Sequence, residues 1–202
     1  MPPDPYFSAA PASPDARRLM PVRLAGRDVE VETAPGVFSP GRIDLGTQVL
    51  LRSVPPPPAT GELLDLGCGW GPLALALGLL SPAARVWAVD VNERALDLVQ
   101  RNAARLGLTR VTAATPDAVP DDVRFDAIWS NPPIRIGKDA LHTMLATWLP
   151  RLTDGATAHL VVQRNLGADS LQQWLAAQWP GELHVERLAS AKGYRVLSVA
   201  RR

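Results

Sequence analysis

Apolar and polar positions follow two different rhythms along this chain, and from residue 62 onward the two rhythms alternate. Short apolar runs are followed by longer segments whose apolar residues recur every three or four positions. The first pattern predicts buried strands, and the second predicts helices with one buried face. The predicted strands are 62–66, 85–89, 111–114, 125–129, 156–162, 183–188 and 194–200. The predicted helices are 71–80, 92–106, 139–149 and 169–178.

The order of these elements predicts an α/β fold. Strands that alternate with helices form a doubly wound, mostly parallel sheet with helices on both faces. Only Ala191, Lys192 and Gly193 separate the last two strands, and three residues are too few for a helical crossover. We therefore expect a seven-stranded sheet in which the last strand is antiparallel.

The first part of the chain follows another pattern. Residues 1–16 are rich in proline, alanine and serine, which predicts a flexible N-terminal arm. Residues 22–24 and 29–31 alternate around Gly26, which predicts a short hairpin. A helix is expected from Asp44 onward.

Four consecutive prolines, 55–58, separate this part from the alternating elements. We expect a single domain over residues 17–202, in which a hairpin-and-helix extension (17–60) precedes the main core (61–202).

Composition excludes several classes of protein. A chain of 202 residues suits one domain with a substantial core. No apolar run is long enough to span a membrane, and the proline-rich start carries no signal segment. Cys68 is the only cysteine, which excludes an intrachain disulfide and a cysteine metal cluster and fits a reducing cytosol. The net charge of +1 argues against a broad grip on nucleic acid but allows a local basic patch. We expect a cytoplasmic protein without membrane contact or bound metal.

A glycine-rich segment, Asp65-Leu66-Gly67-Cys68-Gly69-Trp70-Gly71, follows the first strand of the main core and opens a helix. The glycines allow a tight turn and the close approach of a ligand to the backbone. Asp90 ends the second strand, 21 residues after Gly69, where its carboxylate can accept from both ribose hydroxyls. Asp117 follows the third strand, where it can accept from an adenine amino group.

A tight structural turn for the glycines and helix capping for the two aspartates are the alternative interpretations. The three features at this spacing together favour a cofactor site. The third glycine, Gly71, comes one residue earlier than in the dinucleotide fingerprint, and Pro72 follows it. This form suits a ligand without a pyrophosphate.

Ser130-Asn131-Pro132-Pro133-Ile134 follows the strand at 125–129. Two prolines cannot continue a central strand because they lack the N–H that the ladder needs, so they form a rigid corner. The corner presents the Asn131 amide beside the free carbonyl of Pro132. Two such acceptors suit the binding of a planar amino group, although a simple loop terminator is the alternative interpretation.

The glycine-rich segment, Asp90, Asp117 and the Asn-Pro-Pro corner together resemble the class I S-adenosylmethionine-dependent methyltransferases, whose fold is Rossmann-like. More narrowly, the chain resembles the family of the bacterial small-subunit ribosomal RNA guanine-N2 methyltransferases, as a single-domain member. That resemblance rests also on Gly36-Val37-Phe38-Ser39, Asp44-Leu45-Gly46-Thr47 and Lys192-Gly193-Tyr194-Arg195.

The resemblance implies S-adenosylmethionine as the cofactor and gives three groups of site residues. The implied cofactor-binding residues are Phe38, Thr47, Asp65, Gly67, Cys68, Gly69, Asp90, Asp117, Ala118 and Asn131. The implied catalytic groups are the side chain of Asn131 and the carbonyl of Pro132. The implied substrate-binding residues are Pro133, Ile134, Arg135 and Lys138. A place in the helix start for Thr47, and a solvated rim for Arg135 and Lys138, remain open as alternatives.

Ribosomal RNA or an assembling small ribosomal subunit is the partner that the resemblance implies. Ile134 stands where the wider class has an aromatic residue, which disfavours flipped DNA adenine and protein glutamine as substrates. The alternatives are transfer to a protein glutamine or a small-molecule amine, a nicotinamide-dependent oxidoreductase, and a non-catalytic RNA-binding module. The sequence leaves the oligomeric state open.

Overall fold

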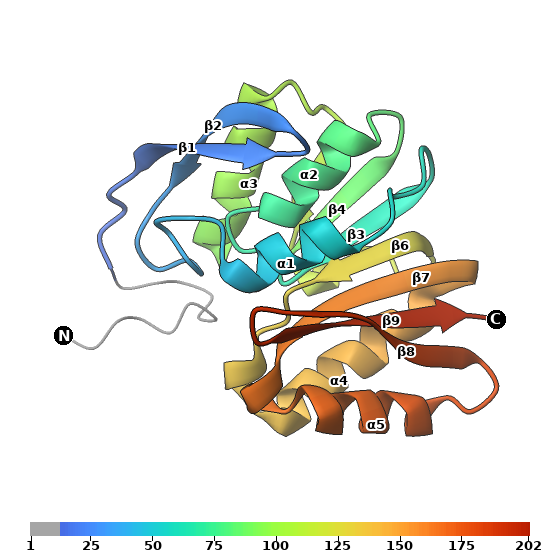
Figure 1. The fold of residues 1–202 in the computed structure, drawn as a ribbon. Helices are drawn as coiled ribbons and strands as arrows, with labels where there is room; N and C mark the ends of the chain where they lie inside the picture. Colours follow the sequence, from blue (N-terminus) through green and yellow to red (C-terminus); the bar gives the residue numbers. More distant parts are fainter. Residues whose placement is uncertain (1–12) are drawn as a thin grey trace.

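The computed structural model describes residues 13–202, so most of the arm expected over residues 1–16 lies outside the described residues. Figure 1 shows a central twisted sheet with helices above and below it. The helices are α1 (Leu45–Ser53), α2 (Pro72–Leu80), α3 (Glu93–Arg105), α4 (Lys138–Trp148) and α5 (Ala168–Gln178). The strands are β1 (Arg18–Leu24), β2 (Arg27–Thr33), β3 (Glu62–Leu66), β4 (Arg85–Val89), β5 (Val111–Ala114), β6 (Phe125–Ser130), β7 (Leu152–Gln163), β8 (Leu183–Ala191) and β9 (Tyr194–Arg201).

The main sheet has seven strands in the order β5-β4-β3-β6-β7-β9-β8. The first five strands of this order are parallel, whereas β9 pairs antiparallel with both β7 and β8. The predicted doubly wound sheet with an antiparallel last strand is therefore confirmed. The chain runs outward from β3 to β5 and then returns to place β6 beside β3, so the strand order reverses between these two. Ligands of open α/β sheets bind at such a reversal, outside the carboxyl ends of the strands.

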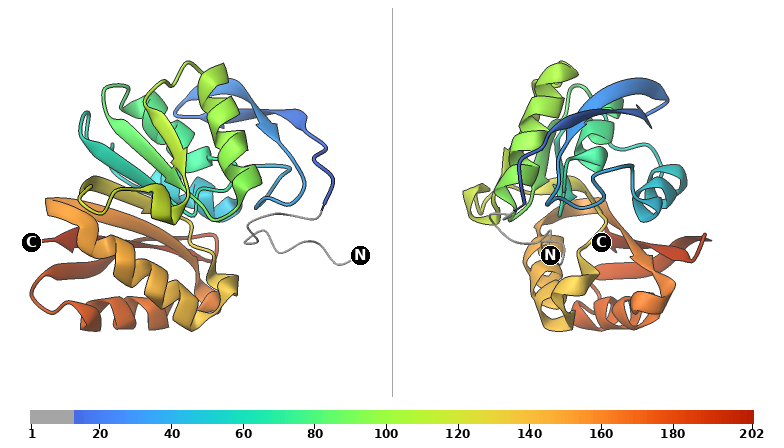
Figure 2. Two further views of the ribbon diagram at one scale, coloured as in Figure 1. Left: turned by 180° about the vertical axis from the view of Figure 1, so that it is seen from behind. Right: turned by 90° about the vertical axis from the view of Figure 1, so that its left-hand side faces the viewer.

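Two apolar layers bury the two faces of the sheet. Helices α1, α2 and α3 cover one face, and α4 and α5 cover the other (Figure 2). Along β4, Val86 and Ala88 face the first layer while Trp87 and Val89 face the second. Because both faces are covered, the central strands are apolar at nearly every position, which explains why their sequences do not alternate.

The short β1–β2 hairpin packs outside α2 and α3 and forms a third layer (Figure 2). A buried asparagine, Asn102 of α3, connects this layer to the core. Its Oδ1 accepts from the backbone N–H of Glu32 at 2.6 Å, and its Nδ2 donates to the carbonyls of Glu32 at 3.0 Å and Trp70 at 3.4 Å. Ser13, in the segment that precedes the hairpin, is also bonded to α3, because Arg94 donates to its side-chain and backbone oxygens.

Loss of the Asn102 amide leaves backbone groups of β2 without partners. We expect Asn102→Ala to lower the free energy of unfolding by about 1–3 kcal/mol, because a poorly solvated N–H and its carbonyl lose their hydrogen bonds. Urea unfolding followed by tryptophan fluorescence measures the change. The exposed Gln100 on the same helix is the matched control, and Gln100→Ala is expected to stay within about 0.5 kcal/mol. Equal effects of the two substitutions would contradict this role of Asn102.

Candidate active site

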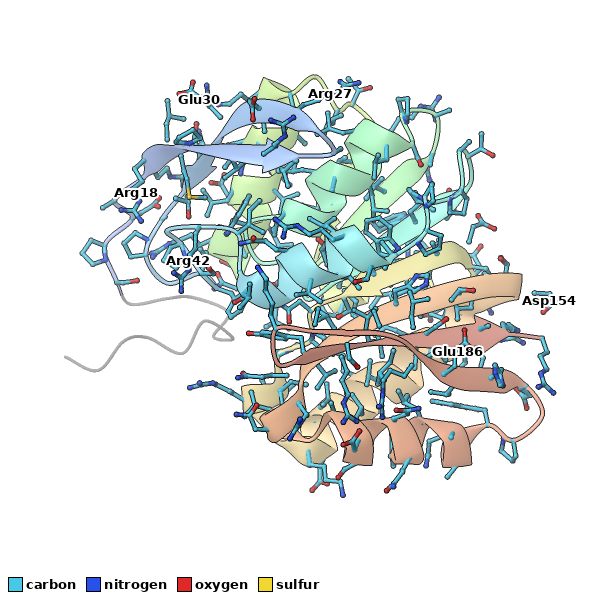
Figure 3. All side chains as sticks on the ribbon, viewed as in Figure 1. Arg18, Arg27, Glu30, Arg42, Asp154 and Glu186 are labelled. Carbon is cyan, nitrogen blue, oxygen red and sulfur yellow. The ribbon has the colours of Figure 1, made fainter. Side chains whose placement is uncertain are left out.

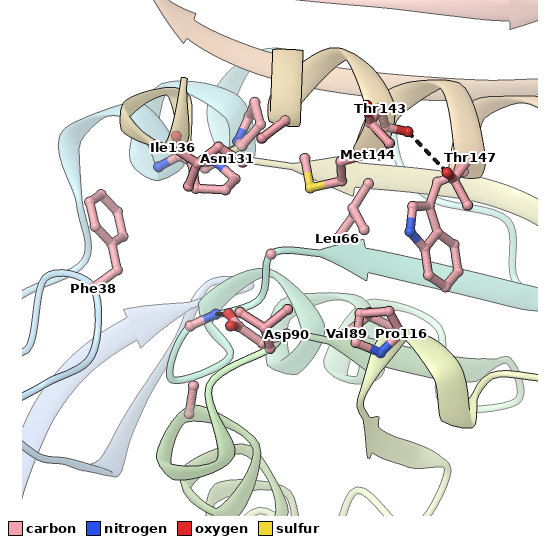
Figure 4. Close-up of a pocket in the computed structure, with 18 residues that line it drawn as sticks. Phe38, Leu66, Val89, Asp90, Pro116, Asn131, Ile136, Thr143, Met144 and Thr147 are labelled. Carbon is pink, nitrogen blue, oxygen red and sulfur yellow. Dashed lines mark hydrogen bonds between the residues drawn. The ribbon is translucent and has the colours of Figure 1, made fainter. Parts of the chain in front are cut away.

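A cavity of about 570 Å³ opens at the carboxyl ends of the central strands, where the strand order reverses. Figure 4 shows Asn131 and Asp90 on opposite sides of it, with Phe38 at one end. A smaller cavity of about 20 Å³ lies beside it and is lined in part by Asp65, Cys68 and Thr47. Phe38, Gly67, Gly69 and Asn131 line both cavities. The fold thus brings together residues from β3, β4, β6 and the loop before α1.

The turn after β3 needs glycine for two different reasons. Gly67 and Gly69 have positive φ values of 75° and 53°, in the left-handed region that favours glycine. Gly71 also has a positive φ, and a Cβ atom there would lie 2.9 Å from Val99 of α3. The first two glycines therefore shape the cavity wall, whereas Gly71 lets α2 start close to α3.

Asp65 at the end of β3 is fully buried. Its Oδ2 accepts from the backbone N–H of Ala74 in the first turn of α2 at 2.8 Å. Its Oδ1 has no hydrogen-bond partner among residues 13–202. Burial, with a smaller contribution from the charge of Asp90, raises the pKa of Asp65 to about 8. The carboxyl group of Asp65 is therefore protonated at neutral pH in the free protein, and its free oxygen is arranged to receive a cation once the group ionises.

Asp90 holds the glycine turn from the end of β4. Its Oδ2 accepts from the N–H of Gly69 at 2.9 Å, and its Oδ1 accepts from the N–H of Asn92 at 3.0 Å. Burial raises the pKa of Asp90, although these backbone hydrogen bonds oppose the rise. Each carboxylate oxygen retains a lone pair, so Asp90 can still accept from ligand hydroxyls in the cavity.

Asn131 directly follows β6 and lines the same two cavities as Gly67 and Gly69 of the glycine turn. Its Nδ2 donates to Asp44 Oδ2 at 3.0 Å and to Thr47 Oγ1 at 3.1 Å. Both N–H groups of the amide are thus used by the first turn of α1 and the residue that caps it. Because the amide is planar, its Oδ1 points away from these acceptors and remains available as an acceptor in the cavity that Asn131 lines.

The proline corner differs from the sequence expectation in one detail. The carbonyl of Pro132 is not free, because it accepts from the N–H of Ile134 at 2.8 Å. With Pro133 at φ −75° and ψ 74°, this is an inverse γ-turn. The turn holds the carbonyl rigidly and leaves it one further lone pair.

Five of the residues expected at the site lie outside the walls of both cavities. Asp117 and Ala118 are exposed on a 3₁₀ turn, and only their neighbour Pro116 lines the larger cavity. A hydrogen bond from Thr115 lowers the pKa of Asp117. The exposed Arg135 and Lys138 lie beyond the corner. Ile134 packs into the apolar layer of α4 and α5, and Ile136 faces the cavity instead.

Sequence reasoning missed one wall of the larger cavity, the face of α4 that carries Ala140, Thr143, Met144, Thr147 and Trp148. These residues recur at helical spacing, which by itself is indistinguishable from a core face. In Figure 4 Met144 and Thr147 lie at the end of the cavity away from Phe38. The buried Cys68, whose pKa is raised by burial, lines only the smaller cavity.

Among residues 13–202, no helix is long and apolar enough to cross a bilayer. In the same part of the chain, histidine, cysteine and acidic side chains form no group of three that could hold a metal ion.

Comparison with protein families gives a match to the methyltransferase small domain over residues 28–198. A Bacillus subtilis protein of uncharacterized function, YbxB, is 31% identical over 195 residues, which cover 95% of this chain and 96% of YbxB. The ribosomal RNA small subunit methyltransferase C of Ectopseudomonas mendocina is 34% identical over 202 residues, but the match covers only 58% of its length.

Among solved structures, the 16S rRNA N2 G1207 methyltransferase of T. thermophilus, in complex with AdoMet and guanosine, superimposes with a TM-score of 0.81. It is 26% identical in sequence, and the superposition covers 95% of this chain and 52% of that one. The chain therefore spans about half the length of these ribosomal RNA methyltransferases, in contrast to its full-length match with YbxB.

The raised pKa of Asp65 makes the stability of the free protein depend on pH. The folded state binds this proton more tightly than the unfolded state does, with a pKa of about 8 against an ordinary value of 3.8. The resulting stabilisation is complete below pH 3.8 and is lost as the pH rises through 8. Between pH 4 and pH 6.5 this loss is opposed by the buried His159, whose pKa is lowered from 6.5 to about 4 by burial. We therefore expect the melting temperature to fall mainly between pH 6.5 and pH 8, and Asp65→Asn to make that fall shallower.

Thermal melts at several pH values measure the slope. Asp121→Asn makes the same chemical change at an exposed position before β6 and should leave the slope unaltered. An Asp65→Asn slope as steep as that of the unaltered protein would show that Asp65 is ionised in the folded state at neutral pH.

Proposed function

The chain belongs to the methyltransferase small domain family, and on that basis we propose that it methylates the exocyclic N2 amino group of a guanine in small-subunit ribosomal RNA, with S-adenosylmethionine as methyl donor. The observation that carries the proposal is the orientation of Asn131. Its amide N–H groups are held by Asp44 and Thr47, so an amide oxygen faces the cavity beside the glycine turn. An acceptor in that place suits a planar amino group.

The residues of the two cavities fit the proposed cofactor. The unpartnered Oδ1 of Asp65 suits the ammonium of the methionine part, next to the turn at Gly67 and Gly69. Asp90 lines the larger cavity, where it suits the ribose hydroxyls. For the adenine we propose the larger cavity beyond Asp90, with Asp117 and Ala118 at its exposed rim. The cofactor, when bound, supplies a methyl group on a sulfonium, which is a good leaving group.

The remaining difficulty lies in the nucleophile, because the lone pair of an exocyclic amine is delocalised into its ring. If Asn131 Oδ1 and the second lone pair of the Pro132 carbonyl both accept from the amine, its nitrogen is held in a more tetrahedral and more nucleophilic form. The same two contacts fix the direction of attack, so positioning and polarisation supply the catalysis. No general base is needed, since methylation makes the nitrogen acidic and its proton can leave to water.

Four exposed cations on loops beside the carboxyl ends of β6 and β7, here called the rim, support RNA as the substrate. Arg135 and Lys138 follow β6, Arg164 follows β7, and Lys192 lies in the turn between β8 and β9. All four side chains are exposed, and none pairs with a carboxylate within the described part of the chain. The N–H of Arg164 donates to the carbonyl of Gly193 at 2.8 Å, which places the last two of these loops side by side.

One exposed carboxylate, Asp139, directly follows Lys138 in the first turn of α4, and the other acidic side chains of this region are engaged elsewhere or distant. Asp169 is engaged by Arg187 and Arg195. Asp154 pairs with Arg201 and lies on the opposite side of the molecule from Arg42 (Figure 3). Unpaired cations on adjacent loops can follow the phosphates of a single RNA strand. We propose that Pro133 and Ile134 support the target base while Arg135 and Lys138 contact the backbone. The likeness to the guanosine-bound T. thermophilus enzyme agrees with this substrate.

Small ribosomal subunits from a strain that lacks the protein provide the test. With labelled S-adenosylmethionine and the unaltered protein, we expect label on the N2 of a guanine in the subunit RNA. Asn131→Ala is expected to lower the rate on the order of 10²-fold, as removal of one positioned polar group typically does, and to affect cofactor affinity far less. Label on a ribosomal protein would support glutamine as acceptor instead, and an unchanged rate for Asn131→Ala would contradict the mechanism.

If the rim binds RNA phosphates, the affinity for the subunits depends on salt concentration. We expect the double substitution Arg135→Ala and Lys138→Ala to raise KM for the subunits without changing kcat. The slope of log affinity against log salt should become shallower by roughly 1.4–1.8 if two phosphate contacts are lost. Arg23→Ala with Arg27→Ala removes the same charge from the exposed hairpin and is the matched control. Equal salt slopes for the two variants would mean that the rim does not hold RNA.

A further inference from the structure

Asn131 is held by a segment that precedes the main core. Its Nδ2 donates to Asp44 and Thr47, which lie 87 and 84 residues earlier in the chain. Asp44 caps α1, because its Oδ2 also accepts from the N–H of Gly46 at 2.7 Å. Thr47 is in the first turn of the same helix and is only 2% exposed.

These acceptors determine which way the amide points. The oxygen and nitrogen of an asparagine amide have nearly the same shape, so the group can turn by 180° without a steric cost. The Oδ2 of Asp44 already accepts from the N–H of Gly46 and serves as an acceptor, so it selects the nitrogen of Asn131. Turned the other way, the amide would present its N–H groups to the N–H groups of the incoming amine, so that two hydrogen-bond donors would face each other.

The first turn of α1 is itself held firmly. A Cβ atom on Gly46 would lie 2.8 Å from Cε1 of Tyr194, at the start of β9, so only glycine lets the helix approach this closely. Burial, with a smaller contribution from the charge of Asp44, raises the pKa of Tyr194, so its ring stays neutral beside the carboxylate. The position of Asp44 and Thr47 is thus set by a contact with the last strand of the sheet.

We propose that Asp44 and Thr47 are positioning residues for methyl transfer, which hold the Asn131 amide with its oxygen toward the accepting amine. This inference rests on the proposed role of Asn131 in binding that amine. It gives Thr47 a task different from the cofactor contact that the family resemblance implies. Its hydroxyl orients the Asn131 amide, which in turn binds the accepting amine.

Two substitutions of nearly the same size separate the hydroxyl from the shape of the side chain. Thr47→Val keeps the branched shape and removes the acceptor, whereas Thr47→Ser keeps the hydroxyl. With small ribosomal subunits as substrate, we expect Thr47→Val to lower kcat at least tenfold while the Kd of S-adenosylmethionine changes less than twofold. Thr47→Ser should recover most of the lost rate. Full activity of Thr47→Val, or a loss that follows weakened cofactor binding, would overturn the proposal.

A second readout needs no substrate. The side-chain NH₂ signals of Asn131 in a proton–nitrogen spectrum are identified by their disappearance in Asn131→Ala. We expect slow solvent exchange for both protons in the unaltered protein and in Thr47→Ser, and fast exchange for one of them in Thr47→Val. Identical exchange in all three proteins would overturn the positioning role, even if the subunits proved not to be the substrate.

The same measurements separate the two proposals. An inactive Asn131→Ala together with a fully active Thr47→Val refutes only the positioning role. An active Asn131→Ala refutes the proposed mechanism itself. Should Thr47→Val fail to fold, Asp44→Ser takes its place, because serine retains a helix cap but is too short to reach Asn131.

Discussion

The site depends on the contact between β3 and β6, the two strands between which the strand order reverses. The hydroxyl of Ser130 donates to the carbonyl of Leu66 at 2.6 Å, and Ser130 is fully buried, so water cannot compete for this bond. The glycine turn leaves one of these strands and the proline corner leaves the other. A Cβ atom on Gly67 would meet Pro133 at 3.4 Å, which shows how closely the two segments approach. Without this pairing, the segment that carries Asn131 and the turn that would hold the methyl donor would not face the same cavity.

The burial of two acidic side chains at the cavities has an electrostatic cost in free energy. Asp65 and Asp90 are both largely removed from water, and the pKa of each is raised mainly by burial. Backbone N–H groups of Ala74, Gly69 and Asn92 compensate for only part of that cost. An uncompensated buried carboxylate is unfavourable in the free protein and favourable once a cation reaches it. Part of the stability of the free protein is therefore given up for affinity, as is common at binding sites.

Local patterns predicted most of the elements within one or two residues, because buried strands and amphipathic helices have distinct periods. Three strands are longer than predicted by a wider margin. β1 and β7 each begin four residues early, at Arg18 and Leu152, and β8 ends three residues late, at Ala191, because partner strands pair with these positions although the sequence there does not follow a buried-strand pattern. In the site, the spacing of the glycine turn, Asp90 and Asn131 predicted that they would share a cavity, and they do. The wall formed by α4 could not be predicted, because its small and apolar residues look like an ordinary core face. Ile136 lines the larger cavity in place of Ile134 because of the γ-turn at Pro133, and no local sequence pattern predicts the direction of that turn.

By itself, the sequence determined the order of strands and helices, the positions where only glycine or proline fits, and the chemical types of the groups at the strand ends. These properties depend on neighbours a few residues away. Only the tertiary structure decided that Asp44 and Thr47 hold Asn131, that the carbonyl of Pro132 is already bonded, and that Asp65 keeps one oxygen without a partner among the described residues. Contacts between residues more than eighty positions apart arise from the packing of α1 against β7 and β9, and periodicity carries no information about which side chains such packing brings together.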